Sequence, residues 1–496
     1  MEHSPPGPTL RILPPVPFTL YNTLTKREEE FRPLEEGKVR LYTCGPTVYG
    51  RPHVGNYSSF LMADLLRRWL QYGLGYKVTH VKNITDVGHL VADADTGEDK
   101  VEKQAREEHG EVTHDSVIAI ARKYEAMYLE DERALNLVEP EERPRATQYI
   151  EEMKAMVEAL LKSGNAYVME DGVYFDVHSS TPTPYGTLSG NTLENLEAGA
   201  RVGVDEKKKH PADFALWKFC VGQNEHHALQ WDSPKGPGGE TYPKGFPGWH
   251  IECSAMSSSL LGEQIDIHTG GEDNIFPHHE CEIAQSESVS GKKPFVRLWL
   301  HKRRIQMGEE KMSKSLGNVK TLDDIRAMGF SPLDLRYLFL SVHYRTQLKF
   351  TQKGLEDAHK ARRKIVEWME EVEESREEKE AEEAKEYEQK FRSAMNADLN
   401  TPEALAAIFD CMTWSRTAKA QGACRAFAAL VRSTFGCFDS NEGDENIPDD
   451  VQALVAKRKG ARASKDFAAS DHLRSEIRAL GYEVRDGDDG QEVRKL

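Results

Sequence analysis

The feature that most restricts the fold of this chain is a strand, a turn, a helix and a second strand within residues 38–85. The run KVRLYTC at 38–44 and the run YKVTHVKNIT at 76–85 are both typical of strands. Between them, the turn-rich GPTVYGRP is followed at 57–71 by apolar residues at helical spacing. Such a unit favours a parallel sheet that binds ligands at the carboxyl ends of its strands. We therefore expect an α/β fold with a Rossmann-type catalytic domain, and a binding loop at 44–56.

The rest of the chain divides into segments of different pattern. Residues 99–248 begin as polar helix and then mix short strands with Gly, Pro, Ser and Thr, which indicates an inserted region. The chain after 330 is almost entirely helical, and we interpret its Glu-rich run at 370–388 as a solvated helix pair. The predicted domains are a flexible leader (1–19), a Rossmann catalytic domain (20–98 and 249–330), an inserted connective region (99–248), a helical bundle (331–440), a linker (441–450) and a small C-terminal domain (451–496).

Charge and composition exclude several classes of protein. With 65 Lys and Arg against 82 Asp and Glu, the net charge of −17 repels phosphates on average, so any nucleic-acid contact must use local basic patches. No apolar run approaches the roughly 20 residues of a membrane span, and the start of the chain has no features of an export or transit signal. Seven cysteines without a CxxC pair argue against a disulfide framework. We expect a cytoplasmic protein with reduced thiols.

Two short motifs could bind phosphate. KMSKS at 311–315 follows the strand-like WLHKRRIQM, so a mobile loop could bring Lys311 and Lys314 to a polyphosphate, although an isolated lysine pair is more often a solvated basic loop. The run PHVGN lies where the first strand gives way to a helix. There His53 and Asn56 can face a phosphate, while Gly55 lets a nucleotide approach the backbone.

A metal site is a second possibility. Cys44 closes the first strand, Cys253 lies on a later predicted helix, and HHECE places His278 and Glu282 four residues apart in a helix predicted to open at Pro277. Two cysteines, a histidine and a glutamate form a plausible zinc shell. Spacing alone also allows Cys281 or His279 as a ligand, and a buried cysteine is by default a small hydrophobic residue.

The two phosphate motifs, in this order on this pattern, resemble the HIGH and KMSKS motifs of class I aminoacyl-tRNA synthetases. From about Leu20 to its end, the chain resembles the cysteinyl-tRNA synthetase family. The resemblance is carried by LYNTLTKREEEF, YTCGPTVYGRPHVGN, KNITDVG, DFALWK, GWHIECSAM, DIHTGGEDNIFPHHECEIAQSE, KMSKSLGN, DLNTPEAL and ARASKDFAASD. The chain departs from the family in having Asn56 in place of the second HIGH histidine, and in longer segments at 87–100 and 220–246.

The resemblance implies a cysteine–tRNA ligase that activates L-cysteine with ATP to cysteinyl-adenylate and transfers it to the terminal adenosine of tRNA(Cys). It implies one zinc ion per chain, which binds the thiolate of the substrate, magnesium with ATP, and a monomer. The implied residues are Cys44, Cys253, His278 and Glu282 for zinc; His53, Asn56, Lys311 and Lys314 for catalysis; His53, Gly55, Gly270, Gly271 and Lys314 for ATP; and Thr85, Trp249, His268 and Asp273 for the amino-acid pocket, with Asp273 facing the substrate ammonium.

The C-terminal segment would read the tRNA. VAKRKGARASKDFAASD is a basic patch on an acidic protein, and the resemblance assigns Arg462, Phe467, Asp471 and Asp486 to the anticodon. Two other functions share part of this pattern. A ligase that joins cysteine to an amino-sugar in mycothiol synthesis shares the zinc and both motifs but lacks the segment 451–496. A zinc-dependent RNA-binding module without catalysis is disfavoured by intact His53, Lys311 and Lys314.

Overall fold

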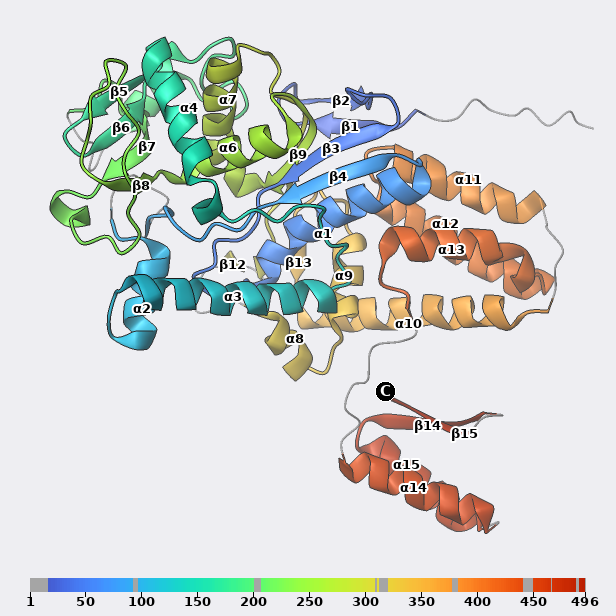
Figure 1. The fold of residues 1–496 in the computed structure, drawn as a ribbon. Helices are drawn as coiled ribbons and strands as arrows, with labels where there is room; N and C mark the ends of the chain where they lie inside the picture. Colours follow the sequence, from blue (N-terminus) through green and yellow to red (C-terminus); the bar gives the residue numbers. More distant parts are fainter. Residues whose placement is uncertain are drawn as a thin grey trace, which may run out of the picture. The chain divides into compact units, whose positions relative to one another are not determined.

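The chain forms two compact units, Met1–Phe438 and Asp439–Leu496 (Figure 1). The structure, a computed structural model, describes residues 17–91, 97–199, 207–307, 310–311, 320–376, 382–439, 449–464, 466–487 and 490–495. Residues 1–16 of the predicted leader and 441–448 of the predicted linker lie outside this part.

A parallel sheet in the order β10-β9-β3-β4 organises the first unit. Its strands are β3 (Lys38–Thr43), β4 (Lys77–Lys82), β9 (Ile265–Gly271) and β10 (Val296–Lys302). Most of their side chains are buried, as expected for strands covered on both faces. Helix α1 (Val54–Arg68) joins β3 to β4, so the predicted unit and the Rossmann-type α/β class are confirmed. The helix begins at Val54, earlier than the apolar spacing predicted, because His53 caps it.

The region between β4 and β9 contains a second, antiparallel sheet, which confirms the predicted insertion. Its strands follow the order β5-β6-β7-β8 and lie beside helices α4, α6 and α7 in Figure 1. The elements are α2 (Lys100–His109), α3 (His114–Ala134), α4 (Ile150–Ser163), β5 (Ala166–Met169), β6 (Gly172–Phe175), α5 (Leu193–Gly199), β7 (Phe214–Phe219), β8 (Gly245–Pro247) and α6 (Trp249–Leu261).

The helix predicted to open at Pro277 begins later than expected. Regular α-helix starts at Glu280, as α7 (Glu280–Ser290), after an irregular turn at Ile275–His279. Phe276, directly before the proline, is extended (φ −140°, ψ 132°). The proline ring disfavours the helical conformation of the residue before it, so the chain turns here before the helix forms.

The remaining elements of the first unit are mostly helical, as predicted. They are the hairpin β1 (Thr19–Asn22) and β2 (Arg27–Glu30), the short strands β11 (Gln306–Met307), β12 (Glu310–Lys311) and β13 (Lys349–Phe350), and the helices α8 (Leu322–Ala327), α9 (Pro332–Leu340), α10 (Gln352–Glu374), α11 (Glu382–Asn396), α12 (Thr401–Ala418) and α13 (Arg425–Phe435). Among the described helices of the chain, none is long and apolar enough to cross a membrane.

The second unit is a helix pair followed by a β-hairpin. It contains α14 (Asp449–Ala463), α15 (Phe467–Ala479), β14 (Tyr482–Gly487) and β15 (Gly490–Lys495), around a small core of Val451, Ile477, Tyr482 and Val484. Strand β15 (GQEVRK) is too polar for its pattern to be recognised without its antiparallel partner β14.

A buried charge network holds α1 to the helical bundle. Asp64 on α1 is 3% exposed and binds two guanidinium groups, Arg68 Nε at 2.8 Å and Arg336 on α9. These arginines also donate to the backbone carbonyls of Leu135, Asn136, Ser433 and Phe435. Burial alone would raise the pKa of Asp64, but the charges of Arg336 and Arg68 outweigh it and lower the pKa to about 2.

We predict that Asp64→Asn destabilises the protein by about 3 to 5 kcal/mol, because it leaves two buried guanidinium groups without their counter-charge. Urea denaturation measures this. Asp357→Asn, which removes an exposed carboxylate paired with Lys353 on α10, should cost less than about 0.5 kcal/mol. Because the folded pKa of Asp64 lies below the unfolded value, its contribution should be fully present above about pH 4 and be lost as the pH falls through about 2. Equal losses of unfolding free energy in Asp64→Asn and Asp357→Asn would contradict the stabilising role assigned to Asp64.

Candidate active site

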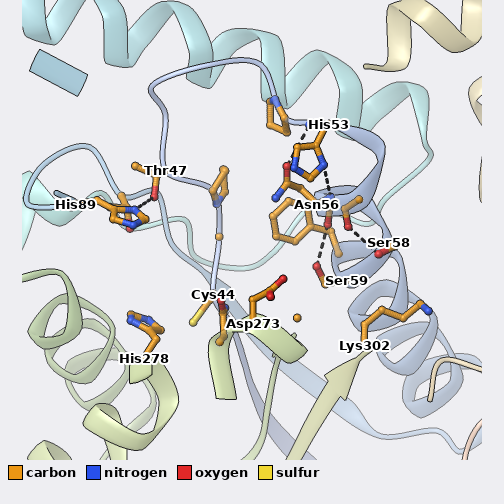
Figure 2. A pocket seen from close by; sticks show the side chains of 18 of the residues that line it. Cys44, Thr47, His53, Asn56, Ser58, Ser59, His89, Asp273, His278 and Lys302 are labelled. Carbon is orange, nitrogen blue, oxygen red and sulfur yellow. Dashed lines mark hydrogen bonds between the residues drawn. The ribbon is translucent and has the colours of Figure 1, made fainter. Parts of the chain in front are cut away.

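A cavity of about 650 Å³ opens at the carboxyl ends of the parallel strands and the amino end of α1 (Figure 2). The predicted site residues that line it are Cys44, His53, Gly55, Asn56, Thr85, Trp249, Cys253, Gly271, Asp273 and His278. His268 and Glu282 are fully buried behind its wall. Gly270 is also behind the wall, where a side chain would collide with the ring of His279. The position of the cavity is the one expected for ligand binding in such a sheet.

Four potential metal ligands converge on one side of the cavity. Cys44 follows β3, Cys253 lies on α6, His278 lies in the turn before α7, and Glu282 lies on α7. Their ligand atoms all lie within 4.8 Å of one another. The sulfur atoms of the two cysteines are 3.8 Å apart, and Glu282 Oε1 lies 3.6 Å from Cys44 Sγ and 3.1 Å from His278 Nε2. Two sulfurs, an imidazole and a carboxylate within this reach fit the donor set of zinc.

A second ligand set overlaps the first. His268 and His279 also lie close enough to Cys44 and Glu282 to share an ion, with His279 Nε2 3.3 Å from Cys44 Sγ. Neither of these histidines lines the cavity, whereas Cys253 and His278 do. The alternative ligand Cys281 belongs to neither set, and its sulfur lies 3.5 Å from the hydroxyl of Tyr185. Three ligands of the first set, Cys44, Cys253 and His278, therefore line the cavity, whereas only Cys44 of the second set does.

Electrostatics favour charged ligands in the first set. Burial would raise the pKa of Cys253, but the hydrogen bond with Cys44 and the charge of His278 lower it to about 6. Burial would also raise the pKa of Glu282, yet His268 and His278 lower it to about 2. In the opposite sense, Cys253 and Glu282 outweigh the effect of burial on His278 and raise its pKa to about 10. These shifts favour a thiolate on Cys253 and a carboxylate on Glu282, and a proton on His278 offsets their two negative charges only in part. Burial and the hydrogen bond with Cys253 instead raise the pKa of Cys44, and a divalent cation would displace the protons of Cys44 and His278.

His53 and Asn56 close the first turn of α1. The backbone N–H of Asn56 donates to Nδ1 of His53 (3.3 Å), and the backbone N–H of His53 donates to Oδ1 of Asn56 (3.1 Å). This is a reciprocal capping box, in which the acceptor Nδ1 leaves the ring proton on Nε2. Figure 2 shows the two side chains together at the rim of the pocket. The arrangement gives His53 a donor for a phosphate, beside a helix end that favours anions.

The predicted amino-acid pocket surrounds Trp249. Its ring stacks on His278 (4.3 Å between centroids) and on His89 (3.9 Å), so it lies between a candidate metal ligand and a residue that the motifs did not indicate. The hydroxyl of Thr85 accepts from Asn83 Nδ2 (3.1 Å). Asp273, expected to face the substrate ammonium, forms an ion pair with Arg304. His268 does not reach the cavity and instead contacts Glu282 Oε2 (3.1 Å).

The structure adds polar residues to the wall that the motifs did not indicate. His89 accepts from Lys100 Nζ (2.6 Å), so its other ring nitrogen carries the proton and faces Thr47 Oγ1 (2.6 Å). Lys302 and its neighbours Arg303 and Arg304 line the opposite side of the cavity. The run HKRR, which begins in β10 and continues past its end, was the signal in the sequence for these three residues.

Two further groups of predicted residues are described only in part. Lys314 lies outside the described residues, and of Lys311 only the backbone is described, in β12. In the second unit, Arg462, Phe467 and Asp471 are exposed on the helix pair, with Phe467 61% exposed. Asp486 lies in β14, and its side chain is not among those described.

Comparisons with known proteins cover most of the chain. Residues 30–360 match the family described as tRNA synthetases class I (C) catalytic domain, residues 390–438 match the DALR domain, and residues 444–494 match the cysteinyl-tRNA ligase anticodon binding domain. The cysteine–tRNA ligase of Chlorobaculum tepidum is 40% identical over 493 residues, which cover 95% of this chain and 97% of the relative. That of Thermus thermophilus is 40% identical over 492 residues, covering 95% and 98%.

Solved structures show the same fold at much lower identity. The methionyl-tRNA synthetase of Mycobacterium tuberculosis superimposes with a TM-score of 0.56 at 14% identity, over 80% of this chain and 92% of that one. This likeness supports the class I fold alone. Together with the matching catalytic and anticodon-binding families and relatives 40% identical over nearly their full length, it leads to one conclusion: this chain belongs to the cysteine–tRNA ligase family of class I aminoacyl-tRNA synthetases.

Proposed function

We propose that this chain activates L-cysteine with ATP and transfers it to the terminal adenosine of tRNA(Cys). The observation that carries the proposal is a single cavity with a thiol, imidazole and carboxylate cluster in one wall and the HVGN turn of α1 at its rim. One end suits a small molecule with a thiol, and the other suits a phosphate. The two ends together match a reaction that joins cysteine to a nucleotide.

The chain would promote adenylate formation by positioning charge. Attack of the cysteine carboxylate on the α-phosphate of ATP needs donors for the phosphate oxygens, with magnesium as the counter-ion of the nucleotide. His53 Nε2 and the amino end of α1 supply such donors, and Lys311 and Lys314 are proposed to add two ammonium groups. Gly271, with no atom closer than 4.0 Å to the position of a Cβ, leaves room for adenosine. The second step uses the same cavity, where a ribose hydroxyl of the tRNA replaces AMP.

Selection of cysteine is proposed to depend on zinc held by Cys44, Cys253, His278 and Glu282. Zinc there would supply a soft Lewis acid that prefers a thiolate to a hydroxyl. Trp249 and Thr85 would form the wall around the substrate, and the stacking of Trp249 on His278 fixes both rings. Asp273, freed from Arg304 in the complex, would accept from the substrate ammonium.

The second unit is proposed to read the anticodon through Arg462, Phe467, Asp471 and Asp486. Exposed Phe467 can stack on an unpaired base, and carboxylates can accept from base amino groups. The presence of this unit disfavours the amino-sugar ligase, because that enzyme has no tRNA to recognise and lacks the segment 451–496. We also propose the domain limits given above, with 331–440 contacting the tRNA stem, and a cytoplasmic monomer.

We predict that Cys253→Ser and His278→Ala lose most of the zinc that the wild-type protein binds at one ion per chain, because each removes one of four converging ligands. Metal analysis of purified protein measures this. Cys281→Ser, which changes a buried cysteine on α7 outside both ligand sets, should keep its zinc. His279→Asn decides between the two ligand sets, since zinc loss there with full retention in His278→Ala would make the assignment wrong.

We predict that in cobalt-substituted protein the sulfur-to-metal charge-transfer absorption, already present from Cys44 and Cys253, increases on titration with cysteine but not with serine. The two amino acids are nearly isosteric, and shape alone separates such pairs by only about 1 to 3 kcal/mol. Absorption spectroscopy tests this, with cysteine-dependent ATP–pyrophosphate exchange measured in parallel. If the cobalt absorption spectrum does not change with cysteine while the enzyme remains selective for cysteine, the metal has a structural role only.

We predict that Phe467→Ala lowers kcat/KM for tRNA charging about tenfold or more and leaves cysteine-dependent pyrophosphate exchange unchanged, because one stacked base contributes about 1 to 3 kcal/mol. Leu480→Ala is the matched control, since it removes another exposed apolar side chain from the same unit. Loss of exchange in the Phe467 variant, or equal effects of both variants on charging, would count against anticodon reading by this residue.

A further inference from the structure

Lys302 is a buried lysine in the wall of the active-site cavity. It is the last residue of β10, where it pairs in register with Gly271 of β9, and it is only 4% exposed. Figure 2 shows it across the pocket from Cys44 and His278, on the side away from the proposed zinc ligands. Lys302 therefore borders the part of the cavity that the nucleotide, rather than cysteine, would occupy.

The neighbouring arginines form ion pairs, whereas Lys302 forms none with the residues that the structure describes. Arg303 Nη1 binds Glu272 Oε2 at 2.9 Å, and Arg304 contacts both Glu272 and Asp273. These two carboxylates lie on the short helix Glu272–Asn274 that follows β9. Among the described residues, Lys302 has no ion pair with a carboxylate, and its Nζ donates only to the backbone carbonyl of Arg303 (3.3 Å).

An ammonium group buried in this way is costly to the fold. Removing a cation from water without a counter-charge is unfavourable, and replacing such a group with an apolar one often stabilises a protein. Burial accordingly lowers the pKa of Lys302 to about 8, and the charge of Glu272 offsets only part of that effect. A perturbed, uncompensated cation in a cleft is therefore a candidate for ligand binding.

We propose that Lys302 is an ATP-binding residue that contacts the triphosphate, in addition to the lysines of KMSKS. The inference rests on the proposed function, because it takes ATP as the occupant of the cavity. The triphosphate is the anionic part of that substrate, and an ammonium group with three donors is suited to phosphate oxygens. Bound phosphate would supply the negative counter-charge that no described carboxylate provides to Lys302.

The test compares Lys302→Met and Lys302→Arg with wild-type protein in cysteine-dependent ATP–pyrophosphate exchange. Lys302→Met should raise KM for ATP about 10- to 100-fold, the usual effect of losing a hydrogen bond to a charged group, with KM for cysteine within about twofold of wild type. Lys302→Arg should recover most of the loss. The thermal midpoint of Lys302→Met should equal or exceed that of wild type, because the variant buries no charge.

Lys77→Met is the matched control. Lys77 begins β4 at the amino end of the same sheet and is exposed, so the variant removes the same charge without touching the cavity. Its KM for ATP should not change. Binding of adenosine, followed by calorimetry, should be equal in wild type and Lys302→Met, since adenosine has no phosphate.

Each other outcome overturns the inference. An unchanged KM for ATP with a lower thermal midpoint would make Lys302 structural, and a parallel loss of adenosine binding would place it against the nucleoside. An effect confined to KM for tRNA in the charging reaction would assign it to the terminal nucleotide instead. Failure of the proposed function is distinguishable, because wild-type protein would then show no cysteine-dependent exchange at all.

Discussion

The parallel pairing of β3 with β9 is the contact on which the active site depends. Tyr42 and Thr43 pair in register with His268 and Thr269, which lie on the far side of the whole insertion. This register brings the end of β3, with Cys44, against the segment that carries His278 and Glu282. The segment after β3 also passes close to the residue that follows β4. A Cβ at Gly45 would lie 1.6 Å from the carbonyl oxygen of Asn83, so only glycine lets the loop leave the sheet along this path.

The cavity separates two kinds of charge. Around Cys253 and Glu282, buried neighbours lower the pKa values of acidic groups, which prepares anionic ligands for a cation. On the opposite side, the strand end carries Lys302, with two arginines already neutralised by Glu272 and Asp273. Because Cys253, Glu282 and Lys302 are shielded from water, their charges act more strongly on a ligand than they would on an open surface. One cavity can therefore hold a thiol substrate and a polyphosphate without mixing their binding sites.

The replacement of the second HIGH histidine by Asn56 has a local explanation. Its short amide side chain accepts a hydrogen bond from the backbone of His53, which in turn accepts from Asn56. The pair thereby satisfies two N–H groups that the start of a helix leaves unpaired. At this position the fold requires an acceptor rather than a charge, so an amide is sufficient for the structural part of the role.

Periodicity and motifs such as HVGN and KMSKS are local properties of the chain, and they were sufficient to predict the Rossmann-type class, the inserted region and the family. The sequence also indicated Cys44, Cys253, His278 and Glu282, but spacing could not separate His278 from His279 or exclude Cys281. Only the tertiary structure showed which side chains line the cavity, that His268 and Gly270 lie behind its wall, and that Lys302 and His89 belong to it. Burial and ion pairing depend on segments that are far apart in the sequence. The pairing of the strands therefore decides whether the ammonium group of a lysine such as Lys302 lies beside a carboxylate or beside a cavity.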